Sequence, residues 1–286
     1  MAIGLALINQ KGGQFKTTTA VNMSYWFAAQ KGLRVLLVDL DPQAHCSHFL
    51  GVEANGGVFR FLVDREPLGN LVIQPRSTLP NLHLLASNKK TANLESELRK
   101  KLAGKASPAL VLFEALRKYA SQYDLFVFDN QPSVSLPQVM SLVASDTYII
   151  PAWMDSSALD GMTQTLESVK ALKEFPAIIQ PTLLGVLPTN FSEARKGDLE
   201  KYQEVATKFK LILPCIRTDS NAARAVDNQM TIWEFAPRAK SATGSKKPIG
   251  LEGANSLGLH GGYLHLCEIV DALIPQIERR TKYARN

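Results

Sequence analysis

A glycine-rich segment near the start of the chain carries the residue types that bind phosphate groups. Two glycines allow a tight turn with inward-pointing backbone N–H groups, and a lysine and a run of threonines follow them. The lysine places a positive charge on terminal phosphates, and a threonine hydroxyl suits Mg²⁺. We therefore expect a phosphate site formed by Lys11, Gly12, Gly13, Gln14, Phe15, Lys16, Thr17 and Thr18.

Three carboxylates stand at the ends of apolar runs, where open α/β sheets place their ligands. Asp39 and Asp41 follow one such run, and Asp129 closes another. In a site that already holds phosphates, these acids would hold water near Mg²⁺ and orient an attacking water molecule. The sequence thus places an acidic group beside the phosphate loop.

The cysteine and histidine pattern gives no clear metal-site signal. The three cysteines, Cys46, Cys215 and Cys267, are scattered and form no C-x-x-C pair, which suits a reducing compartment. His45 and His48 flank Cys46, so metal binding is imaginable there. Surface or supporting roles for these two histidines are favoured.

The elements around the loop define its context. Residues 3–8 have the composition of a buried parallel strand, and residues 17–30 carry a broad apolar helical stripe. Strand, loop and helix in that order are the setting that a phosphate-binding loop requires. Similar apolar runs predict further strands at residues 33–39, 81–88, 123–129, 146–151, 181–188 and 211–214.

Helical periodicity fills the intervals between these strands. The predicted helices cover residues 57–64, 89–105, 107–119, 137–144, 156–173, 192–210 and 263–277. Regular alternation predicts an α/β fold, with one doubly wound, mostly parallel sheet and helices on both faces. We expect a single domain over residues 1–286, interrupted at 238–262 by a loop insertion rich in glycine and lysine.

Composition limits the classes of protein that remain. The chain has 286 residues, 45% hydrophobic and 20% charged, which is typical of a globular protein with a sizeable core. Its apolar runs are too short for a membrane span, and its first residues do not resemble a signal peptide. The net charge of +6 permits binding to nucleic acid or to an anionic membrane without requiring either.

The loop, read as K-G-G-x-x-K-T with a second lysine at its start, resembles the deviant Walker A box of the ParA/MinD family of P-loop ATPases. The D-x-D-P-Q string at 39–43 and the Y-D-(apolar)₄-D strand at 123–129 are similar to the other signatures of that family. The resemblance runs through nearly the whole chain, and no N-terminal helix-turn-helix domain is expected. Two positions depart from the family pattern: Phe15 replaces a glycine, and Gln131 replaces a proline.

The resemblance implies specific roles for several residues. Lys11 would reach across a dimer to the partner's nucleotide, and Asp41 would position the hydrolytic water, with Asp39 supporting it. Thr17, Asp41 and Asp129 would surround Mg²⁺, partly through water. The remaining implied contacts to ATP, on the side of the adenine base, come from Asn190 and Pro214.

The family resemblance also implies a function. A ParA-like protein dimerises on ATP, binds double-stranded DNA without regard to sequence, and positions a plasmid, chromosome or protein assembly when an adaptor protein stimulates hydrolysis. It would be cytoplasmic and associated with the nucleoid, with no integral membrane association. The basic residues expected to contact DNA are Arg217, Arg224, Arg238 and Lys240.

Three alternatives stay open at this point. A MinD-like ATPase acting at a membrane surface would need an amphipathic helix beyond the core, whereas only a short basic tail follows residue 278. A metabolic enzyme on the same fold, such as an iron–sulfur reductase or an amide-forming synthetase, is the second alternative, although the reductase would need cysteines soon after Asp129. A nucleotide-binding scaffold without hydrolysis is the third, because Phe15 and Gln131 depart from the pattern.

Overall fold

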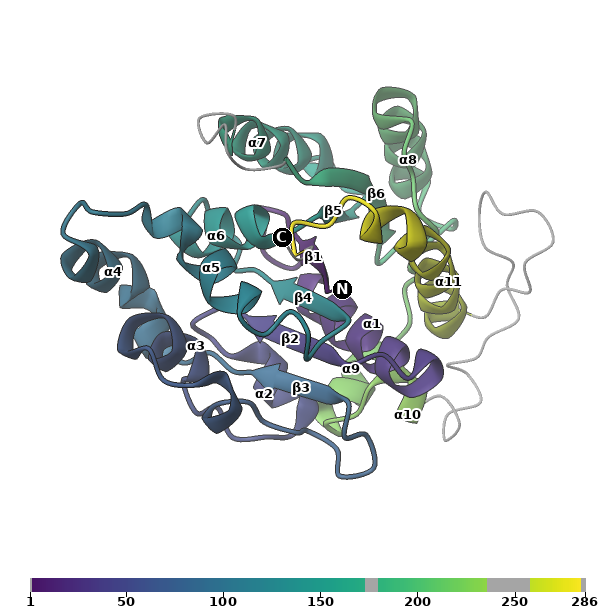
Figure 1. The fold of residues 1–286 in the computed structure, drawn as a ribbon. Coiled ribbons are helices and arrows are strands. Elements are labelled where there is room, and N and C mark those ends of the chain that lie inside the picture. The colour runs from purple at the N-terminus through teal and green to yellow at the C-terminus, as the bar shows by residue number, and fades with distance from the viewer. Residues whose placement is uncertain (1, 173–179, 236–257, 284–286) are drawn as a thin grey trace.

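A six-stranded sheet runs through the middle of the protein (Figure 1). The computed structural model describes residues 2–172, 180–235 and 258–283. The strand order is β3-β2-β4-β1-β5-β6, and every neighbouring pair of strands is parallel. The strands are β1 (Ile3–Leu7), β2 (Val35–Asp39), β3 (Leu82–Leu85), β4 (Leu125–Asp129), β5 (Thr147–Trp153) and β6 (Thr182–Thr189).

Helices connect successive strands and confirm the α/β class. The α-helices are α1 (Lys16–Lys31), α2 (His45–Leu50), α3 (Gly57–Phe59), α4 (Leu94–Leu102), α5 (Val111–Arg117), α6 (Leu136–Ala144), α7 (Ala158–Ala171), α8 (Lys196–Phe209), α9 (Asn221–Asp227), α10 (Ile232–Phe235) and α11 (Gly258–Glu278). A π-helical turn continues α3, and short 3₁₀ turns precede α4 and α5. No helix in the described ranges is both long enough and apolar enough to cross a membrane.

The side chains of successive strand residues point alternately into two hydrophobic cores, one on each face of the sheet. Leu5 and Val127 point into the core covered by α1, α2, α10 and α11. Their neighbours Ala6 and Phe126 point into the opposite core, which α3 to α7 cover. Because these central strands are buried on both faces, their sequences are continuously apolar rather than alternating.

The strand predicted at residues 211–214 is wrong as an extended element. Ile212 makes only an isolated parallel bridge with Val186. This bridge consists of two backbone hydrogen bonds of 2.8 Å, from Val186 N to Leu211 O and from Leu213 N to Val186 O. The next β6 residue that faces this segment is Pro188, which has no N–H to donate, and its carbonyl oxygen accepts from Ile216 N at 2.7 Å.

The insertion was predicted at residues 238–262. The structure does not describe residues 236–257, so most of this segment lies outside the described residues. Its last five positions, 258–262, are not loop but the first residues of α11. Gly262 has a packing reason to be glycine, because a Cβ there would lie 2.7 Å from the carbonyl oxygen of Cys215. The remainder of the insertion stays a prediction.

Candidate nucleotide site

The glycine-rich loop joins β1 to α1 and curls around its own lysine. Lys16 is the first residue of α1 and only 6% exposed. Its Nζ donates a hydrogen bond to the carbonyl oxygen of Lys11, 2.9 Å away. Gly13 has φ 72°, a conformation that glycine adopts without steric cost. A backbone turn at a helix N-terminus with a buried ammonium group is suited to binding phosphate.

Gln14 braces this loop against the neighbouring strand. The backbone N–H of Trp153 on β5 donates to Gln14 Oε1 at 2.7 Å, and Gln14 Nε2 donates to the carbonyl oxygen of Gly12 at 3.2 Å. The side chain is 3% exposed. Gln14 thus shapes the loop through its side chain, which the sequence pattern did not indicate.

Lys11 is held within its own chain. Asn9 Oδ1 accepts from the backbone N–H of Lys11 at 3.0 Å, and Asn9 Nδ2 donates to Pro151 O at 2.8 Å. The Lys11 ammonium lies 3.5 Å from Asp155 Oδ2, just after β5. A Cβ on Gly161 would lie 3.3 Å from Lys11 Cγ, so glycine leaves room for the lysine stem.

The strand register brings two predicted acids together. Asp39 ends β2 and Asp129 ends β4, and the two residues are direct partners in the parallel ladder. Thr17 Oγ1 donates to Asp129 Oδ2 at 2.6 Å, which ties the phosphate loop to β4. Asp39 Oδ1 accepts from the backbone N–H of Asp41 at 3.0 Å and so fixes the turn that follows β2.

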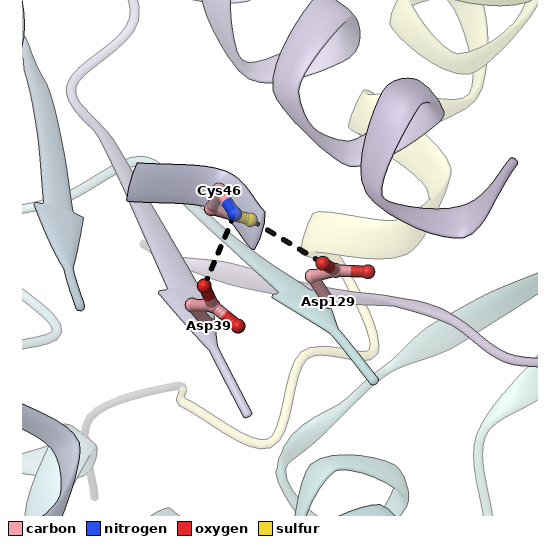
Figure 2. Close-up of side chains that lie close together, drawn as sticks. All are labelled: Asp39, Cys46 and Asp129. Atoms are coloured by element: carbon pink, nitrogen blue, oxygen red, sulfur yellow. Dashed lines mark hydrogen bonds between the residues drawn. The ribbon is translucent and has the colours of Figure 1, made fainter. Parts of the chain in front are cut away.

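Cys46 completes this buried cluster, as Figure 2 shows. Its backbone N–H donates to Asp39 Oδ2 at 3.2 Å, and its Sγ donates to Asp129 Oδ2 at 3.3 Å. Cys46 therefore links the two carboxyls, with its thiol donating to Asp129 and its backbone N–H donating to Asp39. The sequence placed Cys46 only between two histidines and gave no signal for this contact.

Burial dominates the electrostatics of the cluster. It raises the pKa of Asp39 well above its ordinary value, and the neighbouring Asp129 raises it further. It also raises the pKa of Asp129, to about 6, although hydrogen bonds from Thr17 and Cys46 oppose the shift. Burial lowers the pKa of Lys16, against the attraction of Asp129 and Asp41. Such pKa shifts are common at binding and catalytic sites.

The oxygen atoms at this point fit a magnesium ion. Asp129 Oδ1 is buried and has no hydrogen-bond partner among the described residues. Thr17 Oγ1 and both Asp129 oxygens belong to the donor class that Mg²⁺ prefers. Cys46 is a poor ligand for this ion because burial raises its pKa well above the ordinary value and keeps the thiol protonated.

A cavity of about 420 Å³ opens above the loop. The predicted loop residues from Gly12 to Thr18 line one part of it, and Asp41, His45, His48 and Phe49 line another. His45 and His48 were expected to have surface or supporting roles; they are exposed and also contribute to this wall. Its remaining lining consists of Asn130, Pro132 and Val226.

A second cavity, of about 240 Å³, shares Phe15, Thr18 and Val226 with the first. Asn190, Arg217, Asp219, Ala222 and Ala223 complete its lining. The predicted base contact Asn190 therefore lies at a cavity adjoining the phosphate loop. Pro214 is buried in the segment before Arg217, where its contact with a base stays a prediction.

The basic residues predicted to contact DNA separate into three groups. Arg217 is 7% exposed, lines the second cavity and pairs with Glu193 at its Nη2, so it is not a surface residue here. Arg224 is exposed on α9, with its guanidinium 5.8 Å from the ring centroid of Phe235. Arg238 and Lys240 lie outside the described residues.

The fold and site together define a P-loop nucleotide-binding protein. Lys16 and Thr17 open the helix after β1, and carboxylates end β2 and β4 at the same edge of the sheet. A family model described as an AAA domain matches residues 3–180.

Comparison with known proteins gives the family. The chain is 38% identical to the chromosome-partitioning ATPase Soj of Thermus thermophilus, over 83% of this chain and 90% of that protein. It is 30% identical to the sporulation initiation inhibitor protein Soj of Bacillus subtilis, over 83% and 93%. The solved structure of apo McdA from Cyanothece superposes with a TM-score of 0.74 at 22% identity, over 94% and 100%. The protein belongs to the ParA/MinD family of P-loop ATPases.

Proposed function

We propose that this protein is a ParA-like ATPase that dimerises on ATP, binds DNA without sequence preference, and positions a cargo through partner-stimulated hydrolysis. The observation that carries the proposal is the joining of the phosphate loop to the acidic cluster through Thr17 and Asp129. The two Soj proteins, one of them named as a chromosome-partitioning ATPase, support a role in positioning.

The loop binds and orients the triphosphate. Backbone groups of Gly12 to Lys16 surround the phosphates, and the Lys16 ammonium turns from the Lys11 carbonyl to a phosphate oxygen. The ion that Thr17 and Asp129 would hold supplies neutralisation of the phosphate charge. The partly apolar second cavity receives the base beside Asn190.

Asp41 orients the attacking water. It lines the phosphate cavity, is 7% exposed, and its backbone is fixed by Asp39. A carboxylate held in this way positions a water molecule for attack on the terminal phosphate. Asp39 itself is fully buried and acts through Asp41 rather than on the water.

Lys11 acts on the partner's nucleotide in the dimer. Its ammonium group pairs with Asp155 of its own chain, and Lys11 is not among the residues that line the phosphate cavity. A lysine that opens the loop without entering the cavity is suited to a ligand presented by a second subunit. ATP-dependent dimerisation then couples nucleotide state to the assembly of a DNA-binding surface.

The DNA-contacting surface includes Arg224, together with Arg238 and Lys240. Arg224 projects from α9, whose residues Ala222, Ala223 and Val226 line the second cavity. Nucleotide and DNA would therefore act on the same short helix. Binding of this kind consists mainly of phosphate neutralisation and weakens steeply with salt. We place the protein in the cytoplasm, on the nucleoid.

Tail packing argues against the membrane-surface alternative. The Tyr283 hydroxyl donates to Ala144 O at 2.8 Å, and the Thr281 hydroxyl donates to Ala2 O at 2.7 Å. Tyr283 is 2% exposed. These residues after α11 are part of the protein core and present no apolar face to lipid.

Phosphate release by the wild type, Lys16→Ala and Asp41→Ala tests the proposed activity. Slow magnesium-dependent hydrolysis by the wild type, increased by duplex DNA and lost in both variants, is the expected result. Equilibrium ATP binding should survive in Asp41→Ala but not in Lys16→Ala. Hydrolysis by Asp41→Ala at the wild-type rate would remove the role assigned to that carboxylate.

A further inference from the structure

Phe15 occupies a backbone conformation that disfavours any side chain. It precedes α1 with φ 61° and ψ 25°, in the left-handed region where a Cβ is strained. Its carbonyl oxygen is held there by two donors, the backbone N–H of Thr19 at 2.9 Å and Thr19 Oγ1 at 2.7 Å. The turn thus requires the conformation, and an aromatic residue there calls for a functional reason.

Phe15 lies where the two cavities of the nucleotide site meet. Phe15 lines both the phosphate cavity and the second cavity, as do Thr18 and Val226. The second cavity is otherwise bounded on one side by Ala222 and Ala223 of α9. If a nucleotide places its phosphates at the loop and its base beside Asn190, the part between them lies near Phe15, Thr18 and Val226.

We propose that Phe15 contacts the nucleoside part of bound ATP and strengthens binding of nucleotides relative to bare polyphosphates. The proposal rests on the nucleotide binding proposed above. An aromatic face attracts a heterocyclic base or covers the sugar, whereas it offers nothing to a phosphate chain. Phe15 would therefore determine how tightly the site holds ATP and how slowly it releases ADP.

Phe15→Gly tests this role, because glycine adopts the same φ without strain and lacks the ring. Ala103→Gly is the matched control: Ala103 also has a positive φ, 46°, at the end of α4 and outside the lining of both cavities. Titration calorimetry would compare a slowly hydrolysed ATP analogue with tripolyphosphate, both with Mg²⁺. Melting without ligand would verify folding, and Phe15→Leu keeps an apolar side chain without the aromatic face.

Phe15→Gly should bind the ATP analogue about tenfold more weakly and tripolyphosphate within about twofold of the wild type. Phe15→Leu should fall between the two, and Ala103→Gly should match the wild type. The melting temperature of Phe15→Gly without ligand should equal or exceed that of the wild type. Unchanged or tighter analogue binding by Phe15→Gly, or an equal loss for both ligands, would overturn the proposal for Phe15 alone. If the wild type binds neither ligand, the nucleotide-binding proposal itself falls.

Discussion

The Lys11 ammonium lies 3.5 Å from Asp155 Oδ2 of the same chain, with both side chains about one-third exposed. The residue proposed to act across a dimer is thus engaged by an acid of its own subunit. In the proposed dimer, Lys11 would have to leave Asp155 before reaching the partner's nucleotide. The ion pair would then compete with dimerisation.

Asp155→Ala should tighten the ATP-dependent dimer. An ion pair of this exposure contributes at most about 1 kcal/mol, so the gain should not exceed about fivefold in dimer affinity. Sedimentation velocity with a slowly hydrolysed ATP analogue measures it. Asp160→Ala, an exposed acid in the first turn of α7, is the matched control and should leave the dimer unchanged. A weaker dimer for Asp155→Ala would show that Asp155 supports association instead.

Thr17→Ala should abolish most of the magnesium-dependent activity. The Thr17 hydroxyl is hydrogen-bonded to Asp129, where the magnesium ion is expected. A metal ion contributes several kcal/mol to stabilising the phosphoryl group during transfer. We expect hydrolysis to fall by about 100-fold or more. Thr17→Ser keeps the hydroxyl and should retain activity within about tenfold. Equal losses in the two variants would mean that the side-chain volume, and not the oxygen, matters.

Lys282 should make stability depend on pH. Burial lowers its pKa from 10.5 to about 8, although Asp146 opposes the shift. Between those values the unfolded chain holds a proton that the folded chain lacks, so stability should rise with pH. The full shift corresponds to about 3 kcal/mol.

Urea unfolding of the wild type and Lys282→Met between pH 7 and pH 10.5 isolates this effect. The methionine variant keeps the apolar stem and removes the titrating amine. The free energy of unfolding of the wild type minus that of the variant should increase across this range. A difference that is flat or falls with pH would contradict the assigned pKa.

All three thiols should resist modification in the native protein. Cys46, Cys215 and Cys267 are buried, and burial raises the pKa of each, to about 12 for Cys215. Thiolate is the reactive form, so labelling by a disulfide reagent at pH 8 should be very slow. The same reagent should label three thiols per chain in guanidinium. Rapid native labelling of any one would show that its surroundings open.

Much of the fold followed from patterns with a direct physical basis. Continuous apolar runs marked the six strands because parallel strands are buried on both faces, and terminal acids marked the ligand edge. The run at 211–214 has the same composition. It does not form an extended strand because its pairing with β6 ends at Pro188, which has no N–H to donate, and local sequence does not show which segment becomes its partner.

The motif residues of the site were predictable from the sequence, whereas contacts that depend on tertiary packing were not. Lys16 and Thr17 lie beside the acidic cluster as their motif indicated. Arg217 was expected from the family resemblance to contact DNA, but the fold buries it beside the second cavity, where it pairs with Glu193. The contact of Cys46 with both carboxyls depends on how α2 packs against β4, which local sequence does not report.

Binding to a random-sequence DNA duplex, with ADP and then with ATP, tests the proposed switch most directly. The wild type should bind with ATP only, more weakly as salt increases, and Asp41→Ala should remain bound for longer. Equal binding in both nucleotide states, or none in either, would contradict an ATP-gated DNA-binding function for this protein.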